Sequence, residues 1–390
     1  MLESFANFLQ NTGLYALISS GGIDAVKTII MIAIACVLLY LAIVKKFEPL
    51  LLLPIAFGML LSNLPMIKDS SAIMMHTEFF TNPEYMTDGK YINVGYICQH
   101  GGLLDLLYLG VKLGIYPPLI FVGIGCMTDF GPLIANPKSI LLGAAAQFGV
   151  FFTFVGALVL SALVPSINFG IKEAASIGII GGADGPTAIY VTKSLAPALL
   201  PAIAVAAYSY MALIPVIQPP IMKLMTRKKD RMIVMEQLRP VSKTEKILFP
   251  IIVTIIVALI IPDAVSLVGC LMLGNLMKES GVVERLTKMA QNELMNIITL
   301  FLGVTVGATA TASSFLSAQT IGIIVLGLIA FCFSTVGGLF LGDIMCWVTK
   351  GKVNPLIGSA GVSAVPMAAR VSQTVGQKEN PSNFLLMHAM

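Results

Sequence analysis

A series of long apolar runs constrains what this chain can fold into more than any other feature of its sequence. Several of the runs approach the roughly 20 residues that an α-helix needs to cross a bilayer. They lie near 28–44, 48–62, 103–127, 138–164, 199–225, 247–261, 263–277, 294–308 and 319–348. Inside lipid every backbone polar group must be paired within the protein, which favours helices. We therefore predict an all-α polytopic membrane protein, with the run at 103–127 interrupted at Pro117-Pro118.

The composition excludes a soluble protein. Of the 390 residues, 57% are hydrophobic and 11% are charged, whereas soluble domains carry about 25% charged residues. The six cysteines and three histidines show no spacing typical of a metal site or a disulfide framework. The sequence contains no phosphate-binding loop and no nucleic-acid-binding module. We therefore expect neither ATP-driven transport nor a nucleic-acid partner.

The distribution of charge predicts how the chain lies in the membrane. Seven basic residues between Arg227 and Lys246 stand against three acidic ones. Because basic loops stay in the cytoplasm, we expect this loop on the cytoplasmic side. The other long polar stretch, 68–100, is richer in acidic residues, and we expect it on the outer side.

The segment Gly181-Gly-Ala-Asp-Gly-Pro-Thr187 places a carboxylate inside apolar sequence. A charge at that depth costs roughly 2.5–3.5 kcal/mol on insertion scales unless it meets an ion, a proton or a partner. The surrounding glycines and Pro186 favour a break in the helix, and broken membrane helices build ion sites in cation-coupled transporters. Asp184 is therefore our leading candidate ion ligand. The alternative is a kinked helix with a paired, structural aspartate.

Four apolar segments rich in Gly, Pro, Ser, Thr and Asn occur in two pairs, and the members of each pair lie about 180 residues apart. The segments are 124–137, 176–190, 303–320 and 354–366. Irregular backbone survives in a membrane only when it is buried in protein or lines a cavity. We therefore predict two repeats, which we expect to be inverted, with broken helices that meet at a central ion site.

The same pattern divides the chain into five parts. We expect N-terminal membrane segments and an outer loop over 1–102, and a first transport repeat over 103–225. The basic cytoplasmic loop then covers 226–246, scaffold helices cover 247–291, and a second transport repeat covers 292–390.

Neutral oxygens in the second repeat complement Asp184. Its matching position is Gly361, and the nearby Asn354 and Ser363 offer an amide and a hydroxyl oxygen. One carboxylate with neutral oxygens suits Na⁺ better than a soft metal. Helix capping is the alternative for Asn354 and Ser363. Asp129, in a second break, is a candidate cation ligand or proton relay, although capping of the next helix is the interpretation we place first.

Other polar side chains in apolar sequence complete the candidates. Tyr208 and Tyr210 precede Pro215 in an apolar run, where a phenol can pass a proton or bind a ligand. Buried tyrosines are also commonly only packed, with a satisfied hydroxyl. Arg370 follows a break and can hold a carboxylate or phosphate. The alternative for Arg370 is a side chain that extends to the membrane interface.

These segments closely resemble the β subunit of the biotin-dependent, sodium-pumping decarboxylases that act on oxaloacetate, methylmalonyl-CoA or glutaconyl-CoA. The resemblance extends over nearly the whole chain. It is carried by Met127 to Pro137, Ile177 to Ala188, Ala206 to Met222 and Asn354 to Gln373. The most specific parts are Gly-Gly-Ala-Asp-Gly-Pro-Thr and Asn-Pro-Leu-Ile-Gly-Ser-Ala-Gly-Val-Ser-Ala-Val-Pro.

The resemblance implies a sodium-translocating decarboxylase. In this family a carboxyltransferase α subunit moves CO₂ from the substrate to biotin on a carrier protein. The β subunit then decarboxylates carboxybiotin, consumes a proton and exports Na⁺. The implied partners also include a small single-span membrane subunit, further copies of the chain and membrane lipid. The implied location is the cytoplasmic membrane of a bacterium or archaeon, and the substrate acid is chosen by the carboxyltransferase.

Carried over by motif, the resemblance assigns roles to particular residues. Asp184, Asn354 and Ser363 would bind Na⁺, Tyr210 would lie on the proton path, and Arg370 would hold carboxybiotin. Gly358 is also implicated in carboxybiotin handling. The family pattern continues into a Gly-rich final span, so we expect this chain to be truncated at its C-terminus. The competing functions are a secondary Na⁺-coupled carboxylate transporter without decarboxylase chemistry and a non-transporting scaffold.

Overall fold

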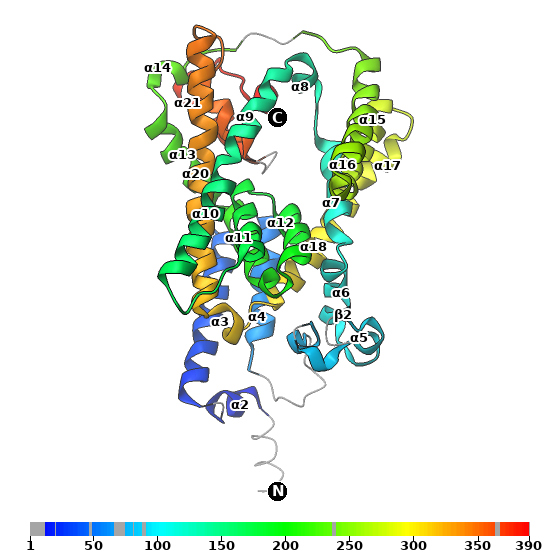
Figure 1. Ribbon diagram of the computed structural model, residues 1–390, viewed down its shortest axis with the longest axis vertical. Helices are drawn as coiled ribbons and strands as arrows, with labels where there is room; N and C mark the ends of the chain where they lie inside the picture. The colour runs from blue at the N-terminus through cyan, green and yellow to red at the C-terminus, as the bar shows by residue number, and fades with distance from the viewer. Residues whose placement is uncertain are drawn as a thin grey trace, which may run out of the picture.

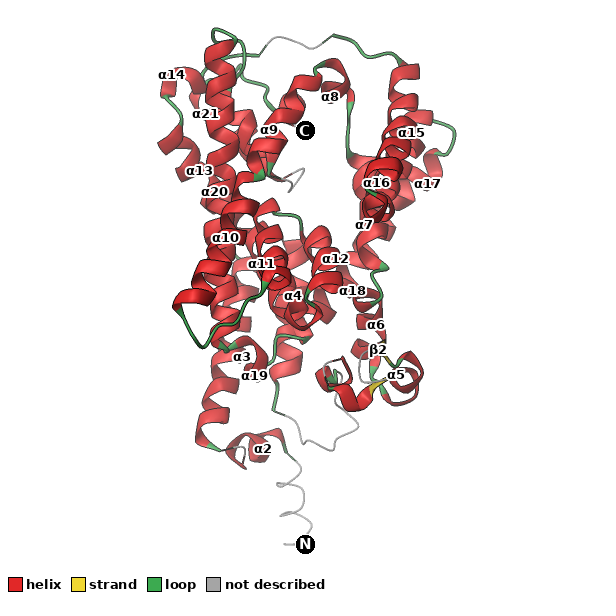
Figure 2. Ribbon diagram, viewed as in Figure 1, coloured by secondary structure: helices red, strands yellow, loops and turns green. Residues whose placement is uncertain are grey.

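The fold is almost entirely helical. The computed structural model describes residues 12–19, 21–46, 49–65, 75–80, 82–87, 91–235, 239–362 and 367–389. The sheet found among these residues is a short antiparallel pair, β1 (Met86–Thr87) and β2 (Tyr91–Ile92), in which Met86 faces Ile92 (Figure 2). The prediction of an all-α protein is confirmed.

The long helices fall on the predicted apolar runs. They are α3 (Gly22–Ile43), α4 (Pro49–Asn63), α6 (Leu103–Lys112), α7 (Tyr116–Met127), α9 (Ile140–Ala146), α10 (Phe148–Leu163), α13 (Leu200–Met225), α15 (Lys243–Ile260), α16 (Val265–Ser280), α18 (Met295–Ala308) and α20 (Ala318–Val348). Shorter helices connect them: α2 (Gly13–Ser19), α5 (Val94–His100), α8 (Gly131–Ala135), α11 (Ile171–Gly178), α12 (Gly185–Leu195), α14 (Lys228–Arg231), α17 (Glu284–Met289), α19 (Ala312–Phe315), α21 (Met367–Glu379) and α22 (Leu386–Ala389). Single turns include η4 (Ile179–Gly182), η8 (Pro355–Gly361) and a π-turn at Ala290–Leu294.

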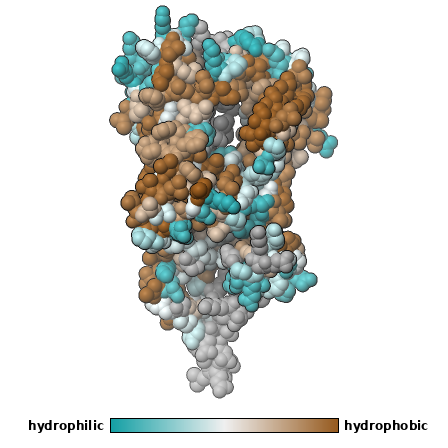
Figure 3. Space-filling model, in the orientation of Figure 1, coloured by the Kyte–Doolittle hydropathy of each residue, from teal (hydrophilic) through white to brown (hydrophobic). Residues whose placement is uncertain are grey.

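The chain has the helices of a membrane protein. Three described helical segments are long and apolar enough to cross a bilayer by themselves: Gly22–Ile43, Pro137–Leu163 and Ala318–Val348. Two bent pairs add up to two more spans, one of them α6 with α7 at an angle of 71°. The visible surface carries apolar side chains across its middle and upper parts, with hydrophilic side chains at both ends (Figure 3).

The bend between α6 and α7 corrects the expected position of the interruption. It occurs at residues 113–115, where Gly114 has a φ of +73°, rather than at Pro117-Pro118. The two prolines occupy the first turn of α7. At that position the missing N–H group has no intrahelical partner to lose, so proline starts the helix instead of breaking it.

The helices form two groups at one end of the molecule (Figure 1). One group contains α13, α14, α20 and α21, and the other contains α7, α15, α16 and α17. Contacts of α12 with α7, and of α13 with α4 and α18, join the two sides. Both broken segments, η4–α12 and η8–α21, pack against α13 and α20.

Two helix pairs repeat the same close contact. In the pair of α7 and α16, a Cβ at Gly125 would collide with the Leu271 carbonyl, and one at Gly274 with the Val122 carbonyl. In the pair of α4 and α18, Gly58 and Gly307 meet carbonyl groups of the facing helix in the same way. Small residues let membrane helices approach closely. Because Gly125 and Gly307 lie 182 residues apart, the two contacts are equivalent in the two halves.

A buried asparagine accompanies each of these contacts. The Asn275 amide of α16 donates to the Thr128 carbonyl at 3.0 Å, just after α7 ends. The Asn63 amide of α4 donates to the Ala310 carbonyl at 2.7 Å, just after α18 ends. Thr128 and Ala310 are again 182 residues apart. At each break, an asparagine from another part of the chain therefore donates to the carbonyl that the helix end leaves free. The Lys278 ammonium is a second donor to the Thr128 carbonyl, at 3.0 Å.

The two halves also follow the same order of elements. The series α7, α8, α9–α10, η4 and α12 parallels the series α18, α19, α20, η8 and α21, except that α11 precedes η4 in the first half and has no counterpart before η8. The segments after the first breaks, α8 and α19, lie far apart along the long axis, α8 near the top of Figure 2 and α19 in its lower half. Inversion of the repeats across a membrane stays a prediction, which this arrangement supports.

Candidate functional site

Asp184 lies at a break between two helical segments, as the sequence predicts. Ala183 ends η4 with a φ of 50°, in the left-handed region, and Asp184 is the extended residue from which α12 begins. Its Oδ2 atom accepts a hydrogen bond from the Thr187 hydroxyl at 2.5 Å. Among the described residues no cation pairs with this carboxylate. A partly buried anion in an apolar bundle is thus left with one neutral partner.

The break at Asp184 adjoins the broken segment of the second half. Ala183 is 1% exposed and belongs to a cluster that contains Ile357 and Val362 from the second half. Leu142 of α9 belongs to the same cluster and lies against Gly361, the residue that matches Asp184 in the repeat. The two breaks therefore share one core, as the predicted central site requires.

Tyr208, rather than Tyr210, lies beside Asp184. A Cβ at Gly185 would lie 2.6 Å from the ring of Tyr208, so the phenol packs directly on the residue after Asp184. The Asp184 carboxylate also acts electrostatically on this phenol. Tyr208 is 2% exposed, and its hydroxyl has no hydrogen-bond partner among the described atoms. The Tyr210 hydroxyl instead donates to the Ile324 carbonyl of α20.

Asn354 has a structural task in the second half. Its Oδ1 atom accepts from the Leu356 N–H at 3.0 Å and so caps η8. Its amide donates to the carbonyls of Arg231 and Ile233 at 3.0 and 2.9 Å. The capping alternative is therefore present in the structure. Because an amide oxygen has two lone pairs, one acceptor position of Asn354 remains for an ion.

Arg231 ties the basic loop to α21 and does not face the solvent. Its guanidinium contacts the Glu379 carboxylate at 3.1 and 3.2 Å and is largely buried. It also donates to the Thr226 carbonyl at 2.5 Å. The Asn383 amide and the Asn354 amide both donate to the Arg231 carbonyl. The broken segment of the second half is thus fixed to the start of the loop.

The remaining predicted site residues fall into different environments. Gly358 is buried against Gly338 of α20, where a Cβ on either residue would collide with the carbonyl oxygen of the other. Arg370 lies on α21 and is exposed, which leaves its guanidinium available to an anion. Ser363 lies outside the described residues.

Asp129 lies in the connection between α7 and α8, apart from the contacts of Asp184. Its Oδ1 atom accepts from the Gly131 N–H at 2.9 Å and from the Lys246 ammonium at 3.1 Å. Burial opposes ionisation of this carboxyl group, but these hydrogen bonds outweigh it and lower the pKa of Asp129. The first of them joins Asp129 to the first residue of α8, although Phe130 occupies the N-cap position of that helix.

Two polar groups beside the breaks had no assigned role in the sequence interpretation. Thr187 is the only described side chain that hydrogen-bonds to Asp184; its spacing, three residues after an aspartate at a helix start, is the signal that could have identified it. Gln218 of α13 donates to the Ser359 carbonyl at 3.1 Å, and its own Oε1 atom is buried without a described partner. Its position before two prolines in an apolar run is a weaker signal.

The arrangement offers a hard-oxygen environment. Within the described ranges, no three His, Cys, Asp or Glu side chains gather as a metal site. A cation at Asp184 would therefore need hydroxyl, amide or carbonyl oxygens to complete its coordination. Such a donor set, with a single carboxylate, fits a monovalent hard cation better than a transition metal.

Comparison with known proteins identifies close relatives. A family model described as the Na⁺-transporting oxaloacetate decarboxylase beta subunit matches residues 27–390. The methylmalonyl-CoA decarboxylase subunit beta of Propionigenium modestum is 57% identical over 390 residues, 100% of this chain and 94% of that protein. The glutaconyl-CoA decarboxylase subunit beta of Acidaminococcus fermentans is 55% identical over 93% of this chain and 87% of that protein. The oxaloacetate decarboxylase beta chain of Klebsiella pneumoniae is 50% identical over 100% of this chain and 94% of that protein.

Proposed function

Because this chain belongs to the family of Na⁺-transporting oxaloacetate decarboxylase beta subunits, we propose that it is the membrane subunit of a sodium-translocating decarboxylase. It decarboxylates carboxybiotin presented by a separate carrier protein, consumes a proton and exports Na⁺ across the cytoplasmic membrane of a prokaryotic cell. Its partners are a carboxyltransferase α subunit, the carrier, a small single-span membrane subunit and further copies of itself.

The acid is selected outside this chain. Relatives named for methylmalonyl-CoA, glutaconyl-CoA and oxaloacetate are 57%, 55% and 50% identical to it. This chain is similarly identical to subunits of enzymes that act on three different acids. This supports a role in a step that these enzymes share, after the acid has given up its carboxyl group. That step is decarboxylation of carboxybiotin, so we assign the choice of acid to the carboxyltransferase.

One observation supports the proposal most strongly. Asp184 is an aspartate at a helix break in an apolar bundle, with Thr187 as its hydrogen-bond partner and no described cation beside it. Leaving a membrane-buried carboxylate without a counterion is costly. A transported Na⁺ removes that cost, and the adjoining broken segments supply neutral oxygens. We assign Asp184, Asn354 and Ser363 to Na⁺.

The chemistry requires a proton as well as an anion site. When the bond between the biotin nitrogen and the carboxylate carbon breaks, CO₂ leaves and the electron pair stays on nitrogen, which then takes up a proton. Arg370, exposed on α21, would hold the carboxylate of carboxybiotin, with Gly358 in the same segment. We assign the proton path to the tyrosines of α13, Tyr210 by family resemblance and Tyr208 by its position beside Asp184.

Coupling follows from the shared charge balance. The Na⁺-loaded site and the bound carboxylate stabilise each other, so carboxybiotin favours the inward-facing, loaded state. Loss of CO₂ removes that preference, and the site can turn outward. A ligand shifts such an equilibrium only by its difference in affinity for the two states.

The test measures decarboxylation of free carboxybiotin against Na⁺ concentration, using membranes that contain this chain with its partner subunits. Wild type is compared with Asp184→Asn, and Asp263→Asn is the matched control because it removes an exposed carboxylate from a loop. We expect Na⁺-dependent decarboxylation in wild type and in Asp263→Asn, and its loss in Asp184→Asn. Na⁺-dependent uptake of an acid without decarboxylation would instead establish a secondary transporter.

A further inference from the structure

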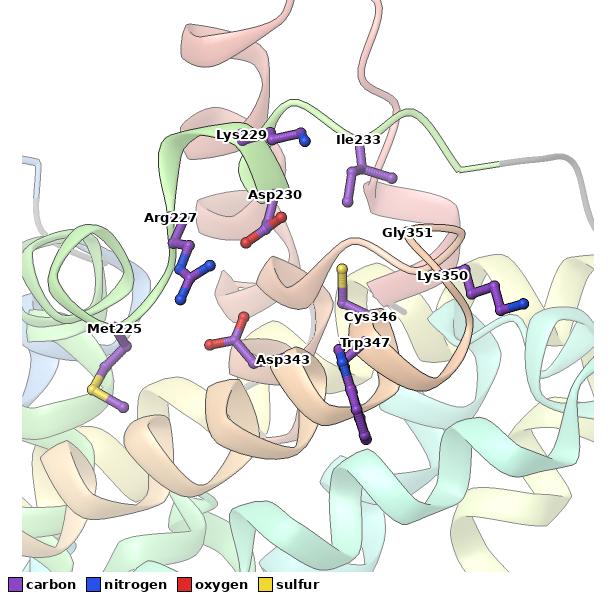
Figure 4. A pocket seen from close by; sticks show the side chains of 10 residues that line it. All are labelled: Met225, Arg227, Lys229, Asp230, Ile233, Asp343, Cys346, Trp347, Lys350 and Gly351. Carbon is purple, nitrogen blue, oxygen red and sulfur yellow. The ribbon is translucent and has the colours of Figure 1, made fainter.

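A pocket of about 740 Å³ opens at the end of α20, on the far side of that helix from the α7–α16 group. Its wall is formed by the end of α13, by α14 and by the last turns of α20 with the residues that follow it. The lining residues are Met225, Arg227, Lys229, Asp230, Ile233, Asp343, Cys346, Trp347, Lys350 and Gly351 (Figure 4). None of them belongs to the candidate ion site.

The charged side chains of the pocket make no direct polar contact with another described side chain, although Arg227 acts on Asp343 through space. In the part of the chain that the structure describes, none of its five charged side chains makes an ion pair or a side-chain hydrogen bond. The carboxylates of Asp230 and Asp343 and the guanidinium of Arg227 point toward one another (Figure 4). Asp230 and Asp343 are partly buried, whereas Arg227 is exposed. The pocket therefore presents two carboxylates inside and cations at its rim.

An apolar surface continues from this pocket along α20. Phe340, Ile344, Trp347 and Val348 are 60%, 38%, 82% and 66% exposed. They follow one another at helical spacing and so share a face. α20 is long and apolar enough to span a bilayer. The pocket lies at the C-terminal end of this helix, next to the basic loop that is predicted to be cytoplasmic. Tryptophan with lysine and arginine at a span end is typical of the lipid headgroup region.

We propose that this pocket binds the headgroup of a phosphatidylethanolamine molecule. The ammonium group donates hydrogen bonds to Asp230 and Asp343, the phosphate accepts from Arg227 with Lys229 and Lys350 nearby, and the acyl chains lie on the exposed face of α20. A zwitterionic headgroup matches both signs of charge in the pocket. Basic pockets at the cytoplasmic side of membrane helices bind the phosphates of anionic lipid headgroups, and here the two carboxylates add a place for a headgroup cation.

The two carboxylates give the pocket its selectivity. Phosphatidylglycerol carries no cation to meet Asp230 and Asp343, so its phosphate would bind beside two unpaired anions. The trimethylammonium group of phosphatidylcholine has no N–H to donate and is bulkier. A primary ammonium offers three donors and fits between carboxylates.

Trp347 makes this testable, because it is the single tryptophan of the chain and lines the pocket. The purified 390-residue chain is reconstituted in vesicles of phosphatidylcholine. A fixed share is then replaced by phosphatidylethanolamine, phosphatidylglycerol or phosphatidylcholine with brominated acyl chains. Bromine quenches tryptophan fluorescence at short range. We expect brominated phosphatidylethanolamine to be enriched at Trp347 about two- to fivefold over the other two lipids, the range that one ion pair near water confers.

Variants identify the groups responsible. Asp343→Asn and Asp230→Asn are expected to remove the preference for phosphatidylethanolamine, and Arg227→Gln to weaken quenching by all three lipids. Asp263→Asn, an exposed carboxylate far along the chain, is the control and should behave as wild type. Equal quenching by the three lipids in wild type, or a preference that survives Asp343→Asn, would overturn the proposal. Absence of quenching by any lipid would also overturn it, since protein would then cover Trp347.

Discussion

Tyr208 and Tyr210 lie two residues apart on α13, so their side chains leave the helix about 200° apart. The structure uses both directions: Tyr208 packs on Gly185 beside Asp184, and Tyr210 reaches the Ile324 carbonyl of α20. Their hydroxyls also differ in state. The Tyr208 hydroxyl is buried without a described partner, whereas that of Tyr210 is satisfied.

The first prediction compares Tyr208→Phe with Tyr210→Phe. Removing an unpartnered hydroxyl does not destabilise a fold, so Tyr208→Phe should keep the wild-type melting temperature in detergent. It should nevertheless weaken the apparent Na⁺ affinity in carboxybiotin decarboxylation about tenfold, because the unpartnered hydroxyl is free to contact an ion held beside Asp184, and a polar contact with a charged group contributes about 1.5 kcal/mol. Tyr210→Phe loses a satisfied hydrogen bond and should cost about 1 kcal/mol of unfolding free energy.

Comparing the two variants distinguishes the assignment of Tyr208, made from its position, from the assignment of Tyr210, made from family resemblance. If Tyr210→Phe abolishes decarboxylation while Tyr208→Phe keeps both activity and Na⁺ affinity, the proton path follows the assignment made by resemblance, and our placement of Tyr208 at the ion site is wrong.

Gly358 supports a second residue-scale prediction. A Cβ at this position would collide with the Gly338 carbonyl, so Gly358→Ala should separate η8 from α20. The expected cost is about 1–3 kcal/mol, typical of overpacking a core. Gly143→Ala on α9, where a Cβ meets nothing within 4 Å, is the matched control and should be neutral or stabilising. Thermal unfolding of the two variants in detergent checks this. If Gly358→Ala loses activity but keeps its melting temperature, Gly358 acts in carboxybiotin binding and not in packing against α20.

At the scale of elements, the apolar runs predicted the long helices well. Burial in lipid leaves the helix as the main solution for such runs. α4 and α20 begin and end within one residue of the expected positions, and α3 begins six residues earlier than expected. The break before α7 was misplaced because proline pairs also start helices, and only the backbone of Gly114 reveals the turn.

The candidate site was less accessible to sequence reasoning. Glycine, proline and aspartate spacing located the break at Asp184, because those residues act locally on the backbone. Which tyrosine faces that break depends on how α13 is rotated against α12, and that rotation is set by packing between segments distant in the chain. The inward turn of Arg231 toward Glu379 has the same origin, since a basic loop residue looks like any other before its partner is placed.

The asparagines that satisfy the two breaks give an element-scale prediction. Asn63→Ala leaves the Ala310 carbonyl without its 2.7 Å donor. Asn275→Ala removes one 3.0 Å donor from the Thr128 carbonyl, which keeps the Lys278 ammonium as a second donor at 3.0 Å. Asn63→Ala should lower the unfolding free energy by about 1–3 kcal/mol, the cost of an unsatisfied buried group, and Asn275→Ala by about 1 kcal/mol, the net contribution of one hydrogen bond. The Asn63 and Asn275 contacts involve different helices and share no partner, so the double variant should show the sum of the two effects. Equilibrium unfolding of the four proteins in detergent measures this, and a strongly non-additive double variant would contradict equivalent, independent joints.

At the scale of the whole molecule, the contacts between the halves indicate a two-fold relation. The glycine contacts of α7 with α16 and of α18 with α4 are equivalent under exchange, and near each of them an asparagine of α16 or α4 donates to the carbonyl that follows α7 or α18. By this equivalence, α15 and α16 belong to the second repeat, and α3 and α4 belong to the first. A two-fold relation with its axis in the membrane plane would place equivalent breaks at opposite membrane faces, where alternating access requires them.

The last prediction tests that orientation with Lys138 and Ala318, which are exposed and lie 180 residues apart, at the repeat spacing. Each is replaced by cysteine in a variant that lacks the six native cysteines, and intact cells are treated with a membrane-impermeant maleimide. Lys138 lies next to α8, at the end of the molecule that carries the basic loop, so Lys138→Cys should react only after permeabilisation. Ala318 begins α20 next to α19, which lies in the opposite half of the molecule (Figure 2), so Ala318→Cys should react in intact cells. Labelling of both cysteines from the same side would show that the repeats are parallel. The ion path would then lie within one repeat and not between the two.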